Sequence, residues 1–239
     1  MSNAAPGGRF LTGSTMGHVI RMTVTGSIGV TFLFLVDAAN LFWVSLLGEE
    51  RLISALGFAW TIQFFSVSFG IGMMIAATAT VSRLIGSGNR TEARLQTTVC
   101  AAAAFLLQLI VTIFGLYYRH EILALAGATG ETAALAARYL VISMPSLPVM
   151  ALGMVGSAVL RAEGDAYRAM MITLASGLIS MVIDPLLIFG LGLDGAALAV
   201  VTARVLSAIL SIWFVMGKHD LVGWATAADF RRLSVPFTL

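Results

Sequence analysis

Residues 172–190 read ITLASGLISMVIDPLLIFG, and this stretch gives the clearest indication of the fold. It is long enough to cross a bilayer, since a membrane-spanning helix needs about 20 mainly apolar residues. Asp184 is its only charged side chain. A charge inside an apolar span costs free energy unless it is paired, protonated or bound to an ion, so an intramembrane carboxylate indicates a functional site.

The residue after Asp184 strengthens this interpretation. Pro185 has no N–H group, so the carbonyl of Met181 loses its helical hydrogen-bond partner. That carbonyl lies one turn before the carboxylate and becomes free to accept a hydrogen bond or to coordinate an ion. A carboxylate beside a free carbonyl oxygen suits a proton or a small hard cation.

The composition of the whole chain is that of a membrane protein. Apolar residues make up 59% of its 239 residues and charged residues only 11%, with a mean hydropathy of +0.94. A soluble globular chain carries roughly a quarter charged residues. Cys100 is the only cysteine, which excludes an internal disulfide and a cysteine metal cluster and predicts a small buried residue.

Six apolar segments separated by short polar breaks follow one another, which predicts an all-α, polytopic membrane protein. Their predicted limits are Val19–Leu47, Leu52–Leu84, Gln96–Tyr118, Thr132–Val159, Arg168–Leu191 and Gly195–Gly217. The first segment is too long for a signal peptide and contains Asp37. We therefore predict a disordered segment over residues 1–15, a six-helix membrane unit over residues 16–218 and a cytoplasmic connector over residues 219–239.

The distribution of basic residues predicts the orientation in the membrane. With a cytoplasmic N-terminus, the cytoplasmic ends and loops contain Arg9, Arg21, Arg83, Arg90, Arg94, Arg161, Arg168, Lys218, Arg231 and Arg232. The opposite side contains only Arg51, Arg119 and Arg138. Cytoplasmic loops of membrane proteins are enriched in Lys and Arg. Both termini are therefore predicted to be cytoplasmic, as an even number of spans requires.

A second intramembrane carboxylate, Asp37, lies in the first span. At the helical rise per residue, Asp37 and Asp184 both lie roughly 25 Å from the cytoplasmic ends of their spans, and Thr202 in the sixth span reaches about the same level. Ser180 precedes Asp184 by one turn and faces the same way. We predict that these four side chains meet in the outer half of the membrane.

Two interpretations of this group stay open. Buried polar groups can simply hold helices together, with about 1 kcal/mol for each hydrogen bond between helices. However, two closely packed carboxylates cannot both ionise without a counter-ion, which favours an ion-coupling site. Arg204 lies at mid-span near Thr202 and is a candidate counter-charge for one carboxylate. Alternatively, Arg204 faces a water-filled cavity or extends toward the membrane surface.

The side chains that would bind a substrate are only weakly indicated. Gln63, Met73 and Met181 are candidates for a substrate cavity, because methionine adapts to varied apolar ligands and Gln63 is polar at mid-span. Such residues also serve ordinary helix packing. The sequence contains no catalytic motif, and its basic residues follow one membrane face instead of forming a patch that would bind nucleic acid. We predict neither an enzyme nor a nucleic-acid-binding protein, and no cofactor.

Three short stretches resemble the multidrug and toxic compound extrusion (MATE) transporters. Residues 82–93, SRLIGSGNRTEA, resemble the loop after the second span, and residues 160–166, LRAEGDA, resemble the loop between spans four and five. Residues 184–190, DPLLIFG, followed by residues 195–199, GAALA, resemble the signature of spans five and six. All three occur in order and in the expected loop or span, and the resemblance extends from about Gly17 to Gly217.

The resemblance implies a proton- or sodium-coupled antiporter that exports amphipathic, often cationic, compounds, including drugs, across the plasma (inner) membrane. Matched by motif, the ion-coupling residues are Asp37, Ser180, Asp184 and Thr202. A coupling sodium ion would bind at Asp37 and Asp184, and no structural metal is implied. The family usually has asparagine at the position of Ser180, whose shorter reach disfavours strong sodium coordination.

Transporters of this family have twelve spans in two six-span lobes, and the chain resembles the amino-terminal lobe. The implied partner is a second lobe or a second copy of this chain, because two lobes of parallel topology could together enclose a substrate cavity. Two alternatives stay open: a non-transporting membrane fragment or assembly subunit, and a lipid-linked precursor flippase of the same superfamily. Apart from Arg204, the spans contain few cationic residues for a pyrophosphate head group, which disfavours the flippase.

Overall fold

The computed structural model describes residues 14–217. Apart from residues 14 and 15, the predicted segment 1–15 and the predicted connector 219–239 lie outside the described residues. The first helix, α1, spans Thr15–Ser45, and its N-cap Ser14 accepts a hydrogen bond from the Gly17 N–H through its hydroxyl oxygen. Within the described range every regular element is helical, which confirms the all-α prediction.

Six helical segments are long and apolar enough to cross a membrane, as predicted. They are α1, α2 (Glu50–Gly86), α3 (Arg90–Tyr117), the pair α5 (Gly130–Ser143) and α6 (Leu147–Ala162), α7 (Ala166–Leu191) and α8 (Leu193–Gly217). The helices α5 and α6 form one span and are joined by a 3-10 turn, η2 (Met144–Ser146). A short helix, α4 (Arg119–Leu125), precedes α5 and has no counterpart among the predicted segments.

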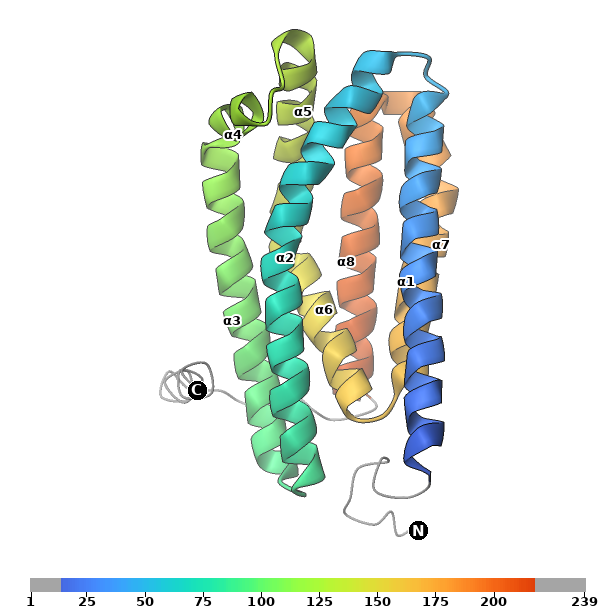
Figure 1. Ribbon diagram of the computed structural model, residues 1–239, viewed down its shortest axis with the longest axis vertical. Helices are drawn as coiled ribbons and strands as arrows, with labels where there is room; N and C mark the ends of the chain where they lie inside the picture. Colours follow the sequence, from blue (N-terminus) through green and yellow to red (C-terminus); the bar gives the residue numbers. More distant parts are fainter. Residues whose placement is uncertain (1–13, 218–239) are drawn as a thin grey trace.

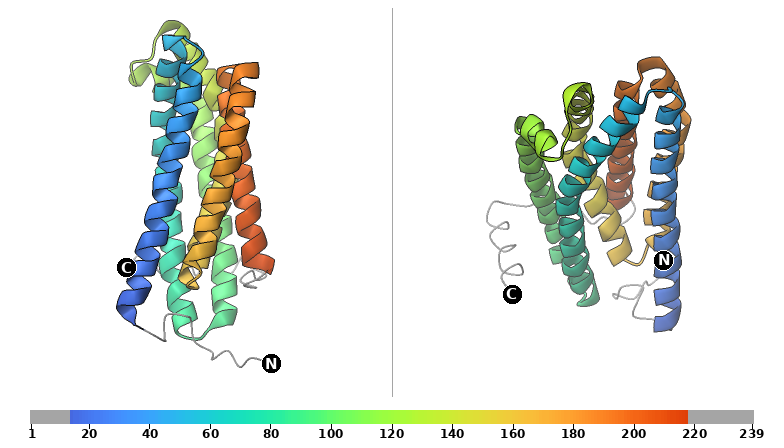
Figure 2. Two further views of the ribbon diagram at one scale, coloured as in Figure 1. Left: turned by 90° about the vertical axis from the view of Figure 1, so that its right-hand side faces the viewer. Right: turned by 45° about the horizontal axis from the view of Figure 1, so that its top comes forward.

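The helices run lengthwise in one bundle, with α1 at one edge beside α7 and α3 at the other edge (Figures 1 and 2). The start of α1 and the end of α8 lie at the same end of the bundle, together with the α2–α3 and α6–α7 turns (Figure 1). The described ends of the chain therefore lie on one side, as an even number of spans requires. The assignment of that side to the cytoplasm rests on the charge pattern.

The α2–α3 and α6–α7 turns are built alike. Each contains a glycine in the left-handed region, Gly88 with φ 77° or Gly164 with φ 86°. Glycine adopts this conformation without the strain that a Cβ would cause. The next residue, Asn89 or Asp165, caps the following helix by accepting a backbone N–H bond through its side chain. The repeated pattern of glycine and then a capping residue explains why both turns are tight.

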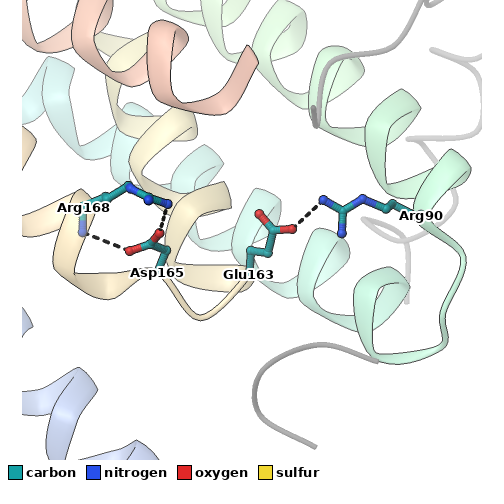
Figure 3. Close-up of polar contacts among 4 residues, drawn as sticks. All are labelled: Arg90, Glu163, Asp165 and Arg168. Atoms are coloured by element: carbon teal, nitrogen blue, oxygen red, sulfur yellow. Dashed lines mark hydrogen bonds and ion pairs between the residues drawn. The ribbon is translucent and has the colours of Figure 1, made fainter. Parts of the chain in front are cut away.

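One ion pair connects these two turns, and a second lies within the α6–α7 turn (Figure 3). Arg90 at the start of α3 lies 2.8 Å from Glu163 at the end of α6, and Arg168 on α7 pairs with Asp165. The stretches 82–93 and 160–166, which are 67 residues or more apart in sequence, therefore meet at one end of the bundle. Because the Arg90 side chain is half exposed, water screens its ion pair, which contributes little stability.

Two apolar clusters fill the bundle. The first joins the first half of α2 to α5 and the start of α8, and the second joins the second half of α2 to α3 and α6. Cys100 belongs to the second cluster and is buried, as predicted. A Cβ on Gly156 would lie 2.8 Å from the Ser211 Cβ, so glycine lets α6 and α8 approach closely. Small residues have this role between helices in lipid.

Candidate functional site

Asp184 lies on α7 and is completely buried. Ser180, one turn earlier, donates a hydrogen bond from Oγ to Asp184 Oδ1 at 3.0 Å, and Asn40 on α1 donates from Nδ2 to Oδ2 at 3.4 Å. Both donors are uncharged, and among the described residues no basic side chain forms an ion pair with Asp184. A carboxylate in this setting is neutral only when it holds a proton or a cation.

Close packing of α1 against α7 brings Asn40 to Asp184. A Cβ on Gly177 would lie 2.7 Å from a ring carbon of Phe32 and 2.9 Å from a methyl group of Val36. Glycine at this position therefore lets α1 approach α7. Because Val36 precedes Asn40 by one helical turn, the contact also sets the level at which Asn40 meets α7.

Asp37 lies three residues before Asn40 on α1, and its side chain is exposed. It lies within range of the charges of Arg204 and Asp184. The described part of the chain gives it no hydrogen bond and no ion pair. The structure therefore brings the two predicted carboxylates near each other, one sealed between helices and one open at the surface.

The other two predicted oxygen ligands differ in their placement. Ser180 contacts Asp184 directly and is buried. Thr202 on α8 donates its hydroxyl to the carbonyl of Leu198 on its own helix, at 2.9 Å. No bond from Thr202 to either carboxylate exists among the described residues. Of the four side chains that were predicted to meet, Ser180 and Asp184 are in direct contact and Asp37 lies nearby. Thr202 bonds to its own helix instead.

Arg204 was a candidate counter-charge for a carboxylate, and it forms no such ion pair within residues 14–217. Instead its guanidinium donates to three uncharged oxygens, one each on α2, α5 and η2. Nη1 donates to the Ser143 carbonyl at 3.1 Å and to Ser146 Oγ at 3.0 Å, and Nη2 donates to Gln63 Oε1 at 2.5 Å. The charge of Arg204 still reaches Asp37 and Tyr139.

The 3-10 turn explains why the Ser143 carbonyl is available to Arg204. In an α-helix this carbonyl would accept from the N–H of Leu147. In η2 that N–H bonds to Met144 instead, because Pro145 and Pro148 interrupt the regular ladder. These prolines therefore leave a backbone acceptor available in the middle of the fourth span.

The candidates for a substrate cavity have other contacts. Gln63 is 4% exposed and links α2 to α5 by donating to Ser143 Oγ at 2.8 Å, in addition to its bond with Arg204. Met73 packs against the apolar cluster of α2, α3 and α6. Met181 is half-buried on α7. Gln63 and Met73 are thus accounted for by contacts between helices.

Sequence reasoning missed Asn40, Ser143 and Ser146. Asn40 carries a usable signal, because an amide three residues after an intramembrane aspartate lies on the same face of the helix. The two serines flank Pro145, and a proline at mid-span points to free backbone acceptors nearby.

The described residues contain no group of three or more His, Cys, Asp or Glu side chains placed to hold a metal ion.

Comparison with known sequences gives consistent matches. The family model described as MatE matches residues 24–186. The chain is 29% identical over 230 residues to a protein of Shewanella oneidensis named FAD transporter, a match that covers 93% of this chain and 50% of that protein. It is 30% identical over 199 residues to the multidrug export protein MepA of Staphylococcus aureus, covering 82% of this chain and 44% of MepA.

Solved structures share the fold. One is described as an outward-facing conformation of a multidrug resistance MATE family transporter of the MOP superfamily; it has a TM-score of 0.86 at 25% identity over 98% of this chain and 52% of that one. Another is a crystal structure of MATE in the bent conformation, with a TM-score of 0.84 at 25% identity over 93% of this chain and 50% of that one. The chain spans about half the length of the relatives it matches.

Proposed function

The chain belongs to the MatE family of multi-pass plasma-membrane transporters, and we propose that it is the ion-coupling lobe of a cation-driven antiporter that exports small amphipathic or cationic compounds. Members of this family are transporters and not enzymes. The observation that carries the proposal is Asp184, a fully buried carboxylate held only by uncharged donors. Such a group must take up a proton or a cation to stay sealed between helices.

The packing of α1 supplies a way to open this site. Helix α1 packs mainly against α7 and touches α2 and α8 at few positions. A movement of α1 relative to α7 would break the bond between Asn40 and Asp184 and admit water to the carboxylate. The open carboxylate can release its ion, whereas the sealed one cannot. Ion binding and the position of α1 are thereby linked.

The exposed carboxylate and the relatives together support a proposal for the substrate class. MepA is named as a multidrug export protein and the Shewanella protein as a transporter of FAD. Asp37 is exposed and unpaired within the described region, and its negative charge attracts cations and repels phosphate groups. We propose that this charge favours amphipathic cations over anionic dinucleotides. The cavity would form between this lobe and a second one, either a second six-span lobe or a second copy of the chain.

Everted membrane vesicles that contain the 239-residue chain test this function. The vesicle lumen is made either more acidic or richer in sodium than the medium. Under either gradient, we expect the vesicles to accumulate ethidium, a cationic dye, faster than vesicles without the chain. Dissipating the gradient with an ionophore should remove the difference. FAD, offered in the same assay, should be accumulated more slowly than ethidium.

Each alternative function has its own outcome in this assay. Vesicles that carry folded chain and accumulate neither compound under either gradient would contradict autonomous export and favour a non-transporting lobe or subunit. Accumulation of FAD without ethidium would overturn the proposed preference for cations.

A further inference from the structure

Arg204 is the least explained charge in the bundle. It lies in the middle of α8, and its guanidinium is surrounded by α2, α5 and η2, with no carboxylate at ion-pair distance among the described residues. A permanent positive charge at such a depth is costly. Arginine cannot relieve that cost by losing its proton, since its side chain stays charged in proteins. The three acceptors it contacts must therefore compensate the charge.

Those acceptors form an unusual set. They are a backbone carbonyl at Ser143, a hydroxyl at Ser146 and a side-chain amide oxygen at Gln63. Uncharged oxygens of these kinds, converging on one point, are ligands that hard cations such as Na⁺ prefer. The proline-containing turn η2 supplies the carbonyl, and Gln63 and Ser143 are further linked by a hydrogen bond of 2.8 Å. The guanidinium uses acceptor oxygens that could otherwise serve as ligands of a free cation.

The charge of Arg204 also acts on the ion-coupling carboxylates. The titratable groups that face it are Asp37 on α1 and Tyr139 on α5, and Asp37 in turn lies within range of Asp184 on α7. Two carboxylates and one guanidinium leave a single negative charge to be neutralised. One monovalent cation therefore suffices, and any second cation at this level is repelled by Arg204.

As the side chains lie in this structure, few oxygens besides its own face Asp184. Ser180 offers one hydroxyl, and the carbonyl of Met181, left without a helical partner by Pro185, adds one more. Asn40 turns its N–H group toward the carboxylate, so that its own oxygen has no partner, and the hydroxyl of Thr202 bonds to its own helix. A hard metal cation usually takes about six oxygen ligands, whereas a proton needs one carboxylate oxygen and an acceptor. Building on the proposed ion-coupled function, we propose that Arg204 is a tethered cation that excludes Na⁺ from this lobe and leaves the proton as its coupling ion.

Sodium binding by the purified chain tests this role without any transport step. Tryptophan fluorescence and ²³Na NMR line width are followed while NaCl replaces choline chloride at constant ionic strength and neutral pH. We expect no saturable response from the wild-type chain. The Arg204→Gln variant, which removes the guanidinium from the three oxygens, should gain saturable Na⁺ binding, with an affinity at least about tenfold above that of the wild type.

Control variants separate the charge from the fold. Arg204→Lys keeps a cation in place and should not bind Na⁺, and Arg138→Gln removes an exposed arginine that pairs with Asp194 and should behave like the wild type. Should Arg204→Gln not fold, Arg204→Met keeps most of the side-chain volume and serves as the second neutral variant. Saturable Na⁺ binding by the wild-type chain would overturn the proposal regardless of any variant, and so would a folded neutral variant that binds no more Na⁺ than the wild type.

The Na⁺ titrations and the vesicle assay can fail independently of each other. Vesicles without export, combined with the expected Na⁺ titrations, would end the transport proposal and leave the role of Arg204 in ion selection at the binding level. Export that is driven by a sodium gradient, with Na⁺ binding by the wild type, would support the transport proposal and overturn the role of Arg204 in excluding Na⁺.

Discussion

The Asp184→Asn variant is expected to insert and fold like the wild-type chain and to lose gradient-driven export by about 100-fold or more, a factor equivalent to roughly 2.7 kcal/mol. The loss follows because an amide does not titrate at physiological pH and carries no negative charge that a bound cation could balance. Export of ethidium by everted vesicles, normalised to the amount of folded chain, measures it. An undiminished rate in this variant would contradict the proposed coupling role of Asp184.

The folding of this variant is expected to survive for a specific reason. The carbonyl oxygen of Asn40 is buried and has no hydrogen-bond partner in the wild-type structure. If the amide of Asn40 rotates by half a turn, this oxygen can accept from the new amide at position 184. Ser180 can still donate to the remaining oxygen. The substitution therefore leaves no additional buried polar group without a partner, which is what would otherwise destabilise it.

Asp194→Asn is the matched control for Asp184→Asn. It makes the same chemical change ten residues later, at the start of α8, where Asp194 forms an ion pair with Arg138 near the surface of the bundle. Exposed ion pairs contribute little to stability. We expect this variant to keep nearly wild-type export, so that a loss confined to position 184 reports the ion site and not the removal of a carboxylate as such.

Hydropathy predicted the number of spans correctly but not the ends of the helices. The third span was predicted to begin at Gln96, whereas α3 begins at Arg90, because Asn89 caps a polar first turn that extends beyond the apolar core. Hydropathy marks only the part of a helix that lies in the apolar core of the membrane, whereas the ends of a helix also depend on its capping residues. For the same reason the seven-residue helix α4, which is too short to span a membrane, produced no signal.

Depth arithmetic succeeded for the carboxylates because their helices are neighbours. The helical rise placed Asp37 and Asp184 at one level, and the packing of α1 on α7 then brought them together. The same arithmetic placed Thr202 and Arg204 at a suitable depth but said nothing of their direction. Rotation about the axis of α8 turns Arg204 toward Gln63, away from an ion pair with either acid. Such rotation depends on the side-chain packing of several helices at once.

The first turn of α8 packs closely against α7 at Gly195, and the Gly195→Ala variant is expected to lose most of its folded yield. A Cβ on Gly195 would lie 1.9 Å from the carbonyl oxygen of Leu187 and 2.3 Å from its carbonyl carbon. These are backbone atoms of the last turns of α7, which cannot move aside as the end of a side chain can. Overpacking usually costs about 1–3 kcal/mol, and a clash with backbone belongs at or above the upper end of that range.

Gly190→Ala is the matched control, because a Cβ there meets no atom within 4 Å and the residue lies five positions earlier on α7. Alanine is a better helix former than glycine by up to about 1 kcal/mol, and Gly190 lies in the last turn of α7, so this variant should be as stable as the wild type or slightly more so. Size-exclusion profiles in mild detergent and the midpoint of thermal unfolding distinguish the two variants. If Gly195→Ala and Gly190→Ala gave equal folded yields, the close approach of α8 to α7 would not be needed to hold Arg204 and Asp184 in their places.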